Sequence, residues 1–134
     1  RDAGRVTSSL SADALRVASK AYAPYSGFHV GAAVLTEAGN TYTGCNVENA
    51  SSGLAICAER AAVAAAVTAE GPGMRLVSVA VANREGKPCS PCGACRQVLV
   101  EFGDPTVTFP GSEGEGQQIE ARASELMPYG FTLD

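Results

Sequence analysis

Residues 57–82, CAERAAVAAAVTAEGPGMRLVSVAVA, contain the pattern that decides the fold. Residues 57–70 are typical of a helix, and Gly71-Pro72-Gly73 ends it because this tripeptide disfavours helical geometry. Residues 75–82 form an almost continuous apolar run, which predicts a central strand buried on both faces. A helix that leads directly into such a strand indicates a layered α/β domain.

The sequence on either side extends this pattern. Before it, residues 30–35 and 41–47 are rich in β-forming residues and are joined by Glu37-Ala38-Gly39-Asn40, which predicts an antiparallel hairpin. The other expected elements are helices over 11–21, 91–102 and 123–127, and strands over 106–109 and 117–121. We therefore expect one domain over residues 1–134, with the polar residues 1–8 loose at its start.

Composition narrows the possible functions. The 134 residues are 46% hydrophobic and 18% charged, which is enough apolar material for one buried core. The net charge of −4, with only 10 Lys and Arg residues, argues against binding to nucleic acid or to an anionic membrane. No apolar run approaches the roughly 20 residues of a membrane span and no leader-like segment opens the chain, so we expect a cytoplasmic protein.

The helix over 57–70 also indicates an oligomer. Residues 61–67 leave it no polar face, and a helix that is apolar all round is normally buried on every side. One small domain rarely encloses a helix completely, so we expect this helix to pack against another subunit. The alternative is an alanine-rich helix whose small methyl groups stay exposed.

Histidine and cysteine restrict the chemistry further. His29 is the only histidine, which excludes mechanisms and metal sites that need two, and no serine-hydrolase motif accompanies it. Among five cysteines, Cys92 and Cys95 form a CxxC pair, which indicates metal or redox chemistry in a chain without a secretion signal. We expect Cys45 and Cys89 to be small buried residues rather than ligands.

Two short segments, Cys57-Ala58-Glu59 and Pro91-Cys92-Gly93-Ala94-Cys95, each open a predicted helix. Cys92 and Cys95 share one helix face, and Cys57 from the other helix start would complete a set of three thiols. The positive end of a helix dipole favours the thiolate, which is the form that binds metal. Three thiolates with one position left open are typical of a catalytic zinc, and Glu59 is close enough to act as its acid and base.

The charge of such a site sets a problem, because zinc with three thiolates has a net charge of −1 and acidifies water less strongly. Hydrogen bonds to the sulfurs would withdraw some of this charge. We expect the donors to come from Arg60, beside Glu59, and from Arg96-Gln97, directly after Cys95.

Further motifs stand in the same order as in a known family. They are residues 23–33 (APYSGFHVGAA), 44–50 (GCNVENA), 91–97 (PCGACRQ) and 126–131 (LMPYGF), besides CAE at 57–59. Zinc deaminases have an H-x-E…P-C-x-x-C signature with a three-cysteine variant, and this chain fits that variant. From about residue 10 to residue 131, the chain resembles the small, homotetrameric cytidine deaminases.

The resemblance implies a three-layer α/β/α sandwich around a mixed five-stranded sheet. It also implies hydrolytic loss of the 4-amino group from free cytidine and 2′-deoxycytidine, with uridine or 2′-deoxyuridine and ammonia as products. One zinc per subunit would be held by Cys57, Cys92 and Cys95. Glu59 would protonate N3 of the base, take a proton from the attacking water and deliver one to the leaving amine.

The resemblance further implies how the substrate is held. Asn46 and Glu48 would bind the ribose hydroxyls, and Phe28 would pack against the base. Phe131 would reach the base in a neighbouring subunit, so that the sites of the homotetramer are shared between chains.

Two alternatives stay open. The family usually has an aromatic residue at the position of Ser52, and a small polar residue there could widen the pocket for a modified cytosine nucleoside, as in blasticidin-type deaminases. From another class, Cys89 could join the three thiols in a closed four-cysteine zinc site or an iron–sulfur cluster of a non-catalytic binding module. Editing of RNA or DNA is disfavoured by the negative charge of the chain.

Overall fold

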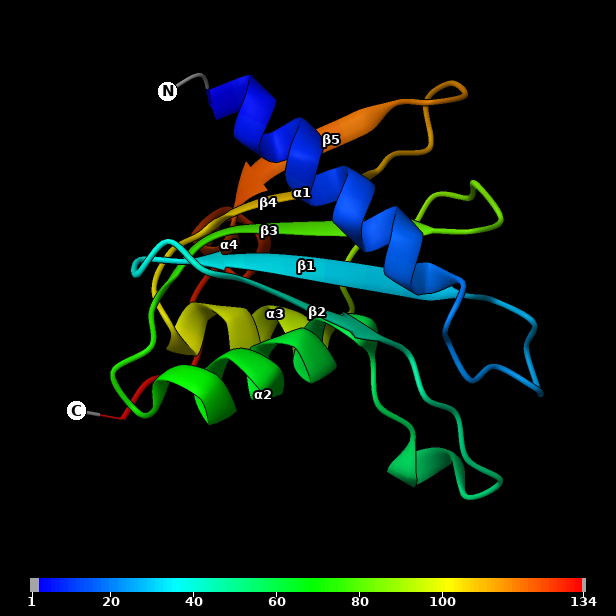
Figure 1. The fold of residues 1–134 in the computed structure, drawn as a ribbon, viewed down its shortest axis with the longest axis horizontal. Helices are drawn as coiled ribbons and strands as arrows, with labels where there is room; N and C mark the ends of the chain where they lie inside the picture. The colour runs from blue at the N-terminus through cyan, green and yellow to red at the C-terminus, as the bar shows by residue number, and fades with distance from the viewer. Residues whose placement is uncertain (1–2, 134) are drawn as a thin grey trace.

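Strand β3 (Leu76–Asn83) occupies the middle of a five-stranded sheet with the order β2-β1-β3-β4-β5 (Figure 1). The structure is a computed structural model that describes residues 3–133, with side chains described for residues 9–133. Strand β1 (Val30–Thr36) pairs antiparallel with β3 on one side and with β2 (Thr41–Cys45) on the other. The predicted hairpin and the predicted central strand are both confirmed.

The other half of the sheet contains its one parallel pairing among the described residues. Strand β3 runs parallel to β4 (Thr106–Pro110), and β4 pairs antiparallel with β5 (Gln118–Arg122). Parallel neighbours need a long crossover, which is provided here by the segment that contains α3 (Gly93–Glu101). The expected mixed five-stranded sheet is therefore confirmed.

Helices cover both faces of the sheet. Successive strand residues point to opposite sides, so the apolar runs of the central strands give the sheet two apolar faces that helices can bury. On one face, Leu10 and Ala14 of α1 (Ala3–Ala18) pack with Ala33 and Ala80. On the other face, α2 (Ala58–Glu70) and α3 cover a larger apolar cluster (Figure 1). The buried sheet residues of this second cluster include Ala32, Val34, Val79, Val81 and Val107. This arrangement confirms the expected three-layer α/β/α sandwich.

Two glycines let helices approach the sheet closely. A Cβ added at Gly31 of β1 would overlap the carbonyl oxygen of Ala14 in α1. A Cβ added at Gly44 of β2 would overlap the backbone nitrogen of Ala62 and lie 2.7 Å from the carbonyl oxygen of Ala58, both in α2. The start of α2, where the first predicted metal ligand lies, is therefore held directly against the sheet.

Some element boundaries differ from the sequence-based expectation. Helix α1 begins at Ala3 rather than near residue 11, so residues 3–8, which we expected to be loose, belong to a helix; residues 1 and 2 lie outside the described residues. A short 3-10 helix, η1 (Ser52–Leu54), was not predicted. The last predicted helix is present as α4 (Ala123–Leu126).

Within the single chain, only one side of helix α2 is buried. Ala62 and Ala66 are fully buried, whereas Ala64 and Thr68 on the other side are exposed. The outer side of α2 is therefore made of small side chains that this one chain leaves uncovered. Within residues 3–133, we find no helix that combines the length and the apolar character needed to cross a membrane.

Candidate active site

The two cysteine segments both fold as helix starts, as the sequence predicts. Cys57 is the N-cap residue of α2, and Cys92 is the N-cap residue of α3, each with extended backbone angles. Cys95 lies in the first turn of α3 and is fully buried. The amino ends of two neighbouring helices thus present their thiols where the helix dipoles favour negative charge.

A loop excursion brings Cys57 to this position. After β2 the chain leaves the sheet, forms η1 and returns, and its two ends are joined at Val47 and Ile56. The backbone nitrogen of each of these two residues donates to the carbonyl oxygen of the other, at 3.0 Å in both cases. This pairing fixes residue 57 beside the end of β2, where Asn46 and Glu48 follow.

The three predicted metal ligands lie together. The sulfur atoms of Cys57, Cys92 and Cys95 are all within 4.8 Å of one another, with 3.8 Å between Cys57 and Cys92 and 3.4 Å between Cys92 and Cys95. A hydrogen bond from Cys95, together with the Arg60 guanidinium, lowers the pKa of Cys57 to about 5. Cys57 is therefore the thiol that ionises readily, in the form that metal binding requires. Its hydrogen bond to Cys57, together with burial, raises the pKa of Cys95.

Cys89 is not part of this cluster among the residues that the structure describes. Burial raises the pKa of its thiol to about 11, so that it stays protonated at neutral pH. These observations argue against the closed four-cysteine site. Three sulfur donors are one fewer than a closed tetrahedral zinc site uses.

Glu59 and Arg60 follow the first thiol in the first turn of α2. The Glu59 residue is only 4% exposed, and burial, with the neighbouring negative charge of Cys57, raises the pKa of its carboxyl to about 7. The Arg60 Nη2 atom lies 3.4 Å from the Cys57 sulfur and donates to it. The first turn of α2 thus provides a buried carboxyl and a cation beside the same sulfur.

A cavity of about 450 Å³ opens at this cluster and collects most of the predicted site residues. Its lining includes Phe28, Asn46, Glu48, Cys57, Glu59, Arg60 and Cys92. Ser52, which departs from the usual residue of the resembled family, also lines it. One cavity of small-molecule size therefore adjoins the thiols, the buried carboxyl, an aromatic ring and a pair of polar side chains.

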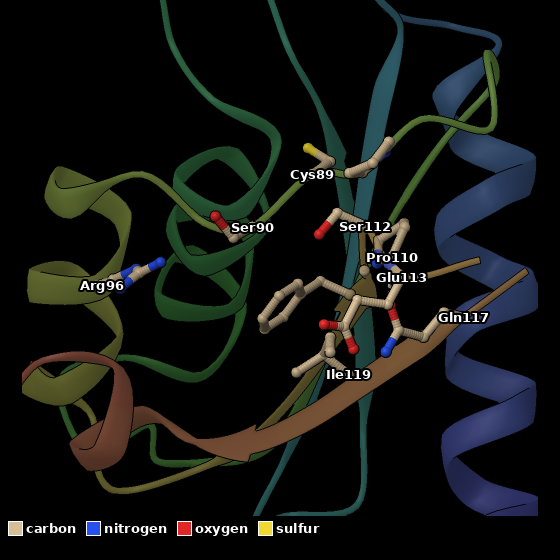
Figure 2. A pocket seen from close by; sticks show the side chains of 11 residues that line it. Cys89, Ser90, Arg96, Pro110, Ser112, Glu113, Gln117 and Ile119 are labelled. Atoms are coloured by element: carbon tan, nitrogen blue, oxygen red, sulfur yellow. Dashed lines mark hydrogen bonds between the residues drawn. The ribbon is translucent and has the colours of Figure 1, made fainter. Parts of the chain in front are cut away.

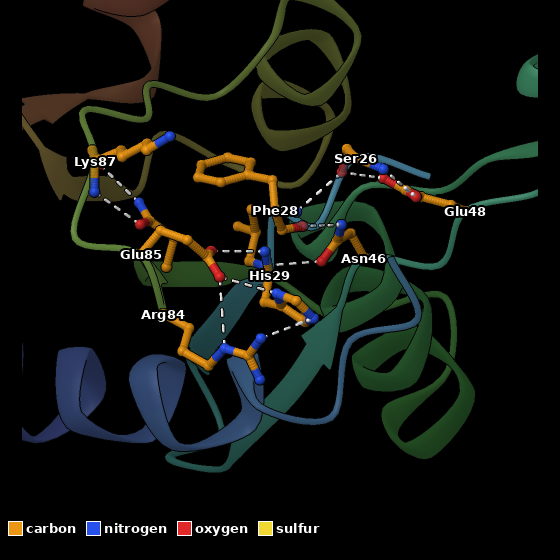
Figure 3. Close-up of polar contacts among 10 residues, drawn as sticks. Ser26, Phe28, His29, Asn46, Glu48, Arg84, Glu85 and Lys87 are labelled. Carbon is orange, nitrogen blue, oxygen red and sulfur yellow. Dashed lines mark hydrogen bonds and ion pairs between the residues drawn. The ribbon is translucent and has the colours of Figure 1, made fainter. Parts of the chain in front are cut away.

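Asn46 and Glu48 bind the segment that carries Phe28 (Figure 3). The Asn46 amide accepts from the backbone nitrogen of Val30 at 2.8 Å and donates to the Phe28 carbonyl oxygen at 2.9 Å. The Glu48 carboxylate accepts from the Ser26 hydroxyl and from the backbone nitrogens of Tyr25 and Ser26. Each side chain keeps hydrogen-bonding capacity for a ligand, because one amide hydrogen and several lone pairs are left.

Three predicted residues, Cys95, Gln97 and Phe131, are not among the residues that line this cavity. The Gln97 amide forms two hydrogen bonds with the backbone of Phe131, 2.8 Å to its oxygen and 3.1 Å from its nitrogen. The Phe131 residue itself is 68% exposed. The neighbouring Arg96 guanidinium donates to the carbonyl oxygens of Pro91 and Leu126.

Sequence reasoning missed several residues that shape the site. Ser26 was not singled out, although its hydroxyl links Glu48 to the backbone nitrogen of Phe28. Ser90 was not singled out either, and Cys89 was considered only as a buried residue or as a fourth sulfur ligand. Both line the cavity, and they also line a second cavity of about 560 Å³ against the β4–β5 hairpin (Figure 2). Their position directly before Pro91-Cys92 was the one available indication that they lie at the site.

Fold and site together define a class: α/β/α domains with a cysteine metal cluster at two adjacent helix starts and a buried glutamate beside it. The family model described as the cytidine and deoxycytidylate deaminase zinc-binding region matches residues 5–110. The chain belongs to this family.

Individual relatives agree with this assignment. The cytidine deaminase of Sporosarcina psychrophila is 41% identical over 93% of this chain and 90% of its own length, and that of Mycobacterium tuberculosis H37Rv is 42% identical over 93% and 89%. The crystal structure of the Burkholderia pseudomallei cytidine deaminase has a TM-score of 0.82 at 42% identity, covering 92% of this chain and 98% of that one. The M. tuberculosis structure has a TM-score of 0.80 at 40% identity, covering 94% and 97%.

The cofactor of this site is zinc. The family model describes a zinc-binding region, and the donor set fits the metal because zinc prefers thiolate sulfur in a compact cluster. Cys57, Cys92 and Cys95 are the residues that would hold it.

Proposed function

We propose that the protein catalyses the hydrolytic deamination of cytidine and 2′-deoxycytidine to uridine and 2′-deoxyuridine in pyrimidine salvage. The observation that carries the proposal is the buried Glu59 carboxyl, which lines one cavity together with Cys57 and Cys92 of the thiol cluster. The relatives that match over most of the chain carry the name cytidine deaminase.

In the proposed reaction, water adds to C4 of the base and the bond from C4 to the exocyclic nitrogen breaks, with release of ammonia. Zinc, when bound, supplies a Lewis acid that activates the water. Glu59 takes a proton from this water, protonates N3 and delivers a proton to the departing amine. Its burial excludes bulk water from these transfers.

The other cavity residues hold the nucleoside. The Phe28 ring provides an apolar wall for the base, since an aromatic face packs well against a planar heterocycle. The free hydrogen of the Asn46 amide and the free lone pairs of Glu48 are suited to adjacent ribose hydroxyls. The lining contains one cation, Arg60, which faces sulfur, so the cavity favours a neutral nucleoside over a phosphorylated one.

The proposal is tested by following the absorbance change as cytidine is converted to uridine, with zinc measured in the same samples. The Glu59→Gln variant keeps all three thiols, so we expect unchanged zinc content and less than about one tenth of the turnover. A variant that keeps its zinc and more than this rate would contradict the role of Glu59. A folded, zinc-loaded wild-type protein without turnover would contradict the activity itself.

A modified cytosine nucleoside is the second candidate substrate. Ser52 lines the cavity and is exposed, and its small side chain leaves room beside the substrate. The same absorbance assay with cytosine nucleoside analogues decides between the two. Higher kcat/KM for an analogue than for cytidine would favour the second candidate.

We further propose a cytoplasmic homotetramer in which each cavity is completed by a neighbouring chain. The exposed Phe131 side chain and the small side chains on the outer side of α2 support this arrangement, because the described residues of the single chain leave both uncovered. In its own chain Phe131 is not among the residues that line the cavity at the thiols, which suits contact with another subunit.

A further inference from the structure

We propose that Glu85 is a positioning residue. It binds residues 28–30 from outside the cavity and thereby holds the Phe28 ring in the position where it packs against the base. The kinetic part of this proposal rests on the deaminase function proposed above. Glu85 lies in the turn after β3 and is not among the residues that line the cavity.

Residues 28–30 lead into β1 without regular structure up to Val30, so side chains must satisfy part of their backbone. The Phe28 nitrogen and oxygen bind the Ser26 hydroxyl and the Asn46 amide. The Val30 nitrogen and oxygen bind the Asn46 side chain and backbone. Between them, the His29 nitrogen donates to the Glu85 carboxylate at 2.8 Å. Glu85 is thus the side chain that holds the middle of this segment.

Glu85 also holds the His29 ring (Figure 3). Its second carboxylate oxygen lies 2.9 Å from Nδ1 of His29, and both side chains are largely buried, at 16% and 23% exposure. On the other side of the ring, Nη2 of Arg84 lies 3.2 Å from Nε2. A guanidinium can only donate and a carboxylate can only accept, so the pair of contacts favours the tautomer with its hydrogen on Nδ1.

The turn that carries Glu85 is itself braced. The buried Asn83 side chain accepts from the Lys87 nitrogen at 2.8 Å and donates to the Lys87 oxygen at 2.7 Å. The Arg84 nitrogen also donates to the His29 oxygen at 2.9 Å. The turn therefore binds both the backbone and the ring of His29. The residues on either side of His29, Phe28 and Val30, line the cavity.

Steady-state kinetics test this role. Phe28 contacts the base and not the reacting protons, so Glu85→Ala should weaken binding of substrate and transition state alike. We expect KM for cytidine to rise about five- to tenfold, with kcat within about twofold of wild type. Glu85→Gln keeps an acceptor for the His29 nitrogen and should recover part of the loss. Glu37→Ala removes an exposed carboxylate at the other end of β1 and should behave as wild type.

His29 provides a second readout that does not depend on turnover. Because it is the only histidine of the chain, its ring nitrogens give one pair of signals in a long-range proton–nitrogen NMR spectrum. We expect the Nδ1–H form in wild type and in Glu37→Ala. Glu85→Ala should give a mixture of forms, and Glu85→Gln should shift toward the Nε2–H form, since its amide can donate to Nδ1.

The two readouts separate the possible failures. An unchanged KM in Glu85→Ala, or a loss confined to kcat and thermal stability, would overturn the positioning role. A wild-type spectrum without the Nδ1–H form would overturn the contact itself. If wild type does not turn over cytidine, the proposed function fails, and the His29 spectra of wild type and Glu85→Ala still decide whether Glu85 holds the segment.

Discussion

Arg60 is the residue on which the charge of the metal site depends most directly. Its guanidinium donates to the Cys57 sulfur at 3.4 Å, and its Nε atom is buried without a hydrogen-bond partner among the described residues. Three thiolates leave a bound zinc with a net negative charge, and a donor to one sulfur withdraws part of it. The position of Arg60 therefore favours both metal retention and acidification of the water.

We expect Arg60→Ala to lower zinc affinity or turnover about 10- to 100-fold. Competition with a chromogenic chelator measures the affinity, and the cytidine assay measures the rate. Arg60→Lys keeps the positive charge without the planar guanidinium. Its zinc affinity and turnover should lie between those of wild type and Arg60→Ala. Unchanged affinity and unchanged rate in Arg60→Ala would remove Arg60 from the metal site.

Among single residues, the metal ligands could be predicted because they follow short spacing in the sequence. Contacts with segments far along the chain could not be predicted. The three thiols meet because each lies in or next to the first turn of a helix, which the sequence indicates. Gln97 was expected near the sulfurs, but its amide binds the backbone of Phe131, which is 34 residues further on. No local sequence pattern predicts which part of the fold the segment around Phe131 contacts.

The contact between α2 and β2 requires a glycine. Replacing Gly44 by Ala would place a methyl group against the backbone of Ala58 and Ala62, neither of which has a flexible side chain to move aside. We expect Gly44→Ala to lower the free energy of unfolding by about 1–3 kcal/mol, measured by chemical denaturation. Gly73→Ala, where an added Cβ meets nothing within 4 Å, is the control and should be neutral or slightly stabilising. Equal stability of the two variants would contradict the close approach.

Elements marked by a long apolar or alanine-rich run could be predicted, and those determined by tertiary contacts could not. The apolar run of β3 and the alanine-rich sequence of α2 predicted these two elements directly, and both lie within about two residues of the expected bounds. The first turns of α1, over residues 3–8, could not be predicted because they lack an apolar repeat. The 3-10 helix η1 lies in an excursion whose ends are joined by Val47 and Ile56, a pairing that sequence patterns do not show.

The proposed homotetramer with shared sites makes a specific prediction for the whole assembly. If Phe131 completes the cavity of a neighbour, Phe131→Ala should raise KM for cytidine about tenfold, the loss typical of a buried aromatic anchor. Glu59→Gln is expected to lose most of its turnover because its own acid–base group is missing, and it keeps Phe131. Tetramers mixed from these two variants contain cavities with both residues intact, so activity at low substrate should exceed the sum of the separate variants. A simple sum in co-expressed, size-verified tetramers would contradict shared sites.

The order of β1, β3 and the three thiols along the chain has a consequence for synthesis. Val34 lies opposite Val79, and Cys57 is in the chain between them, whereas Cys92 and Cys95 follow β3. A nascent chain that has left the ribosome only as far as β3 carries one of the three thiols, and pairing between such distant strands is slow compared with local hairpin or helix formation. The three thiols can therefore come together only after the chain as far as Cys95 has left the ribosome, and the metal site forms only as both helix starts fold against the sheet.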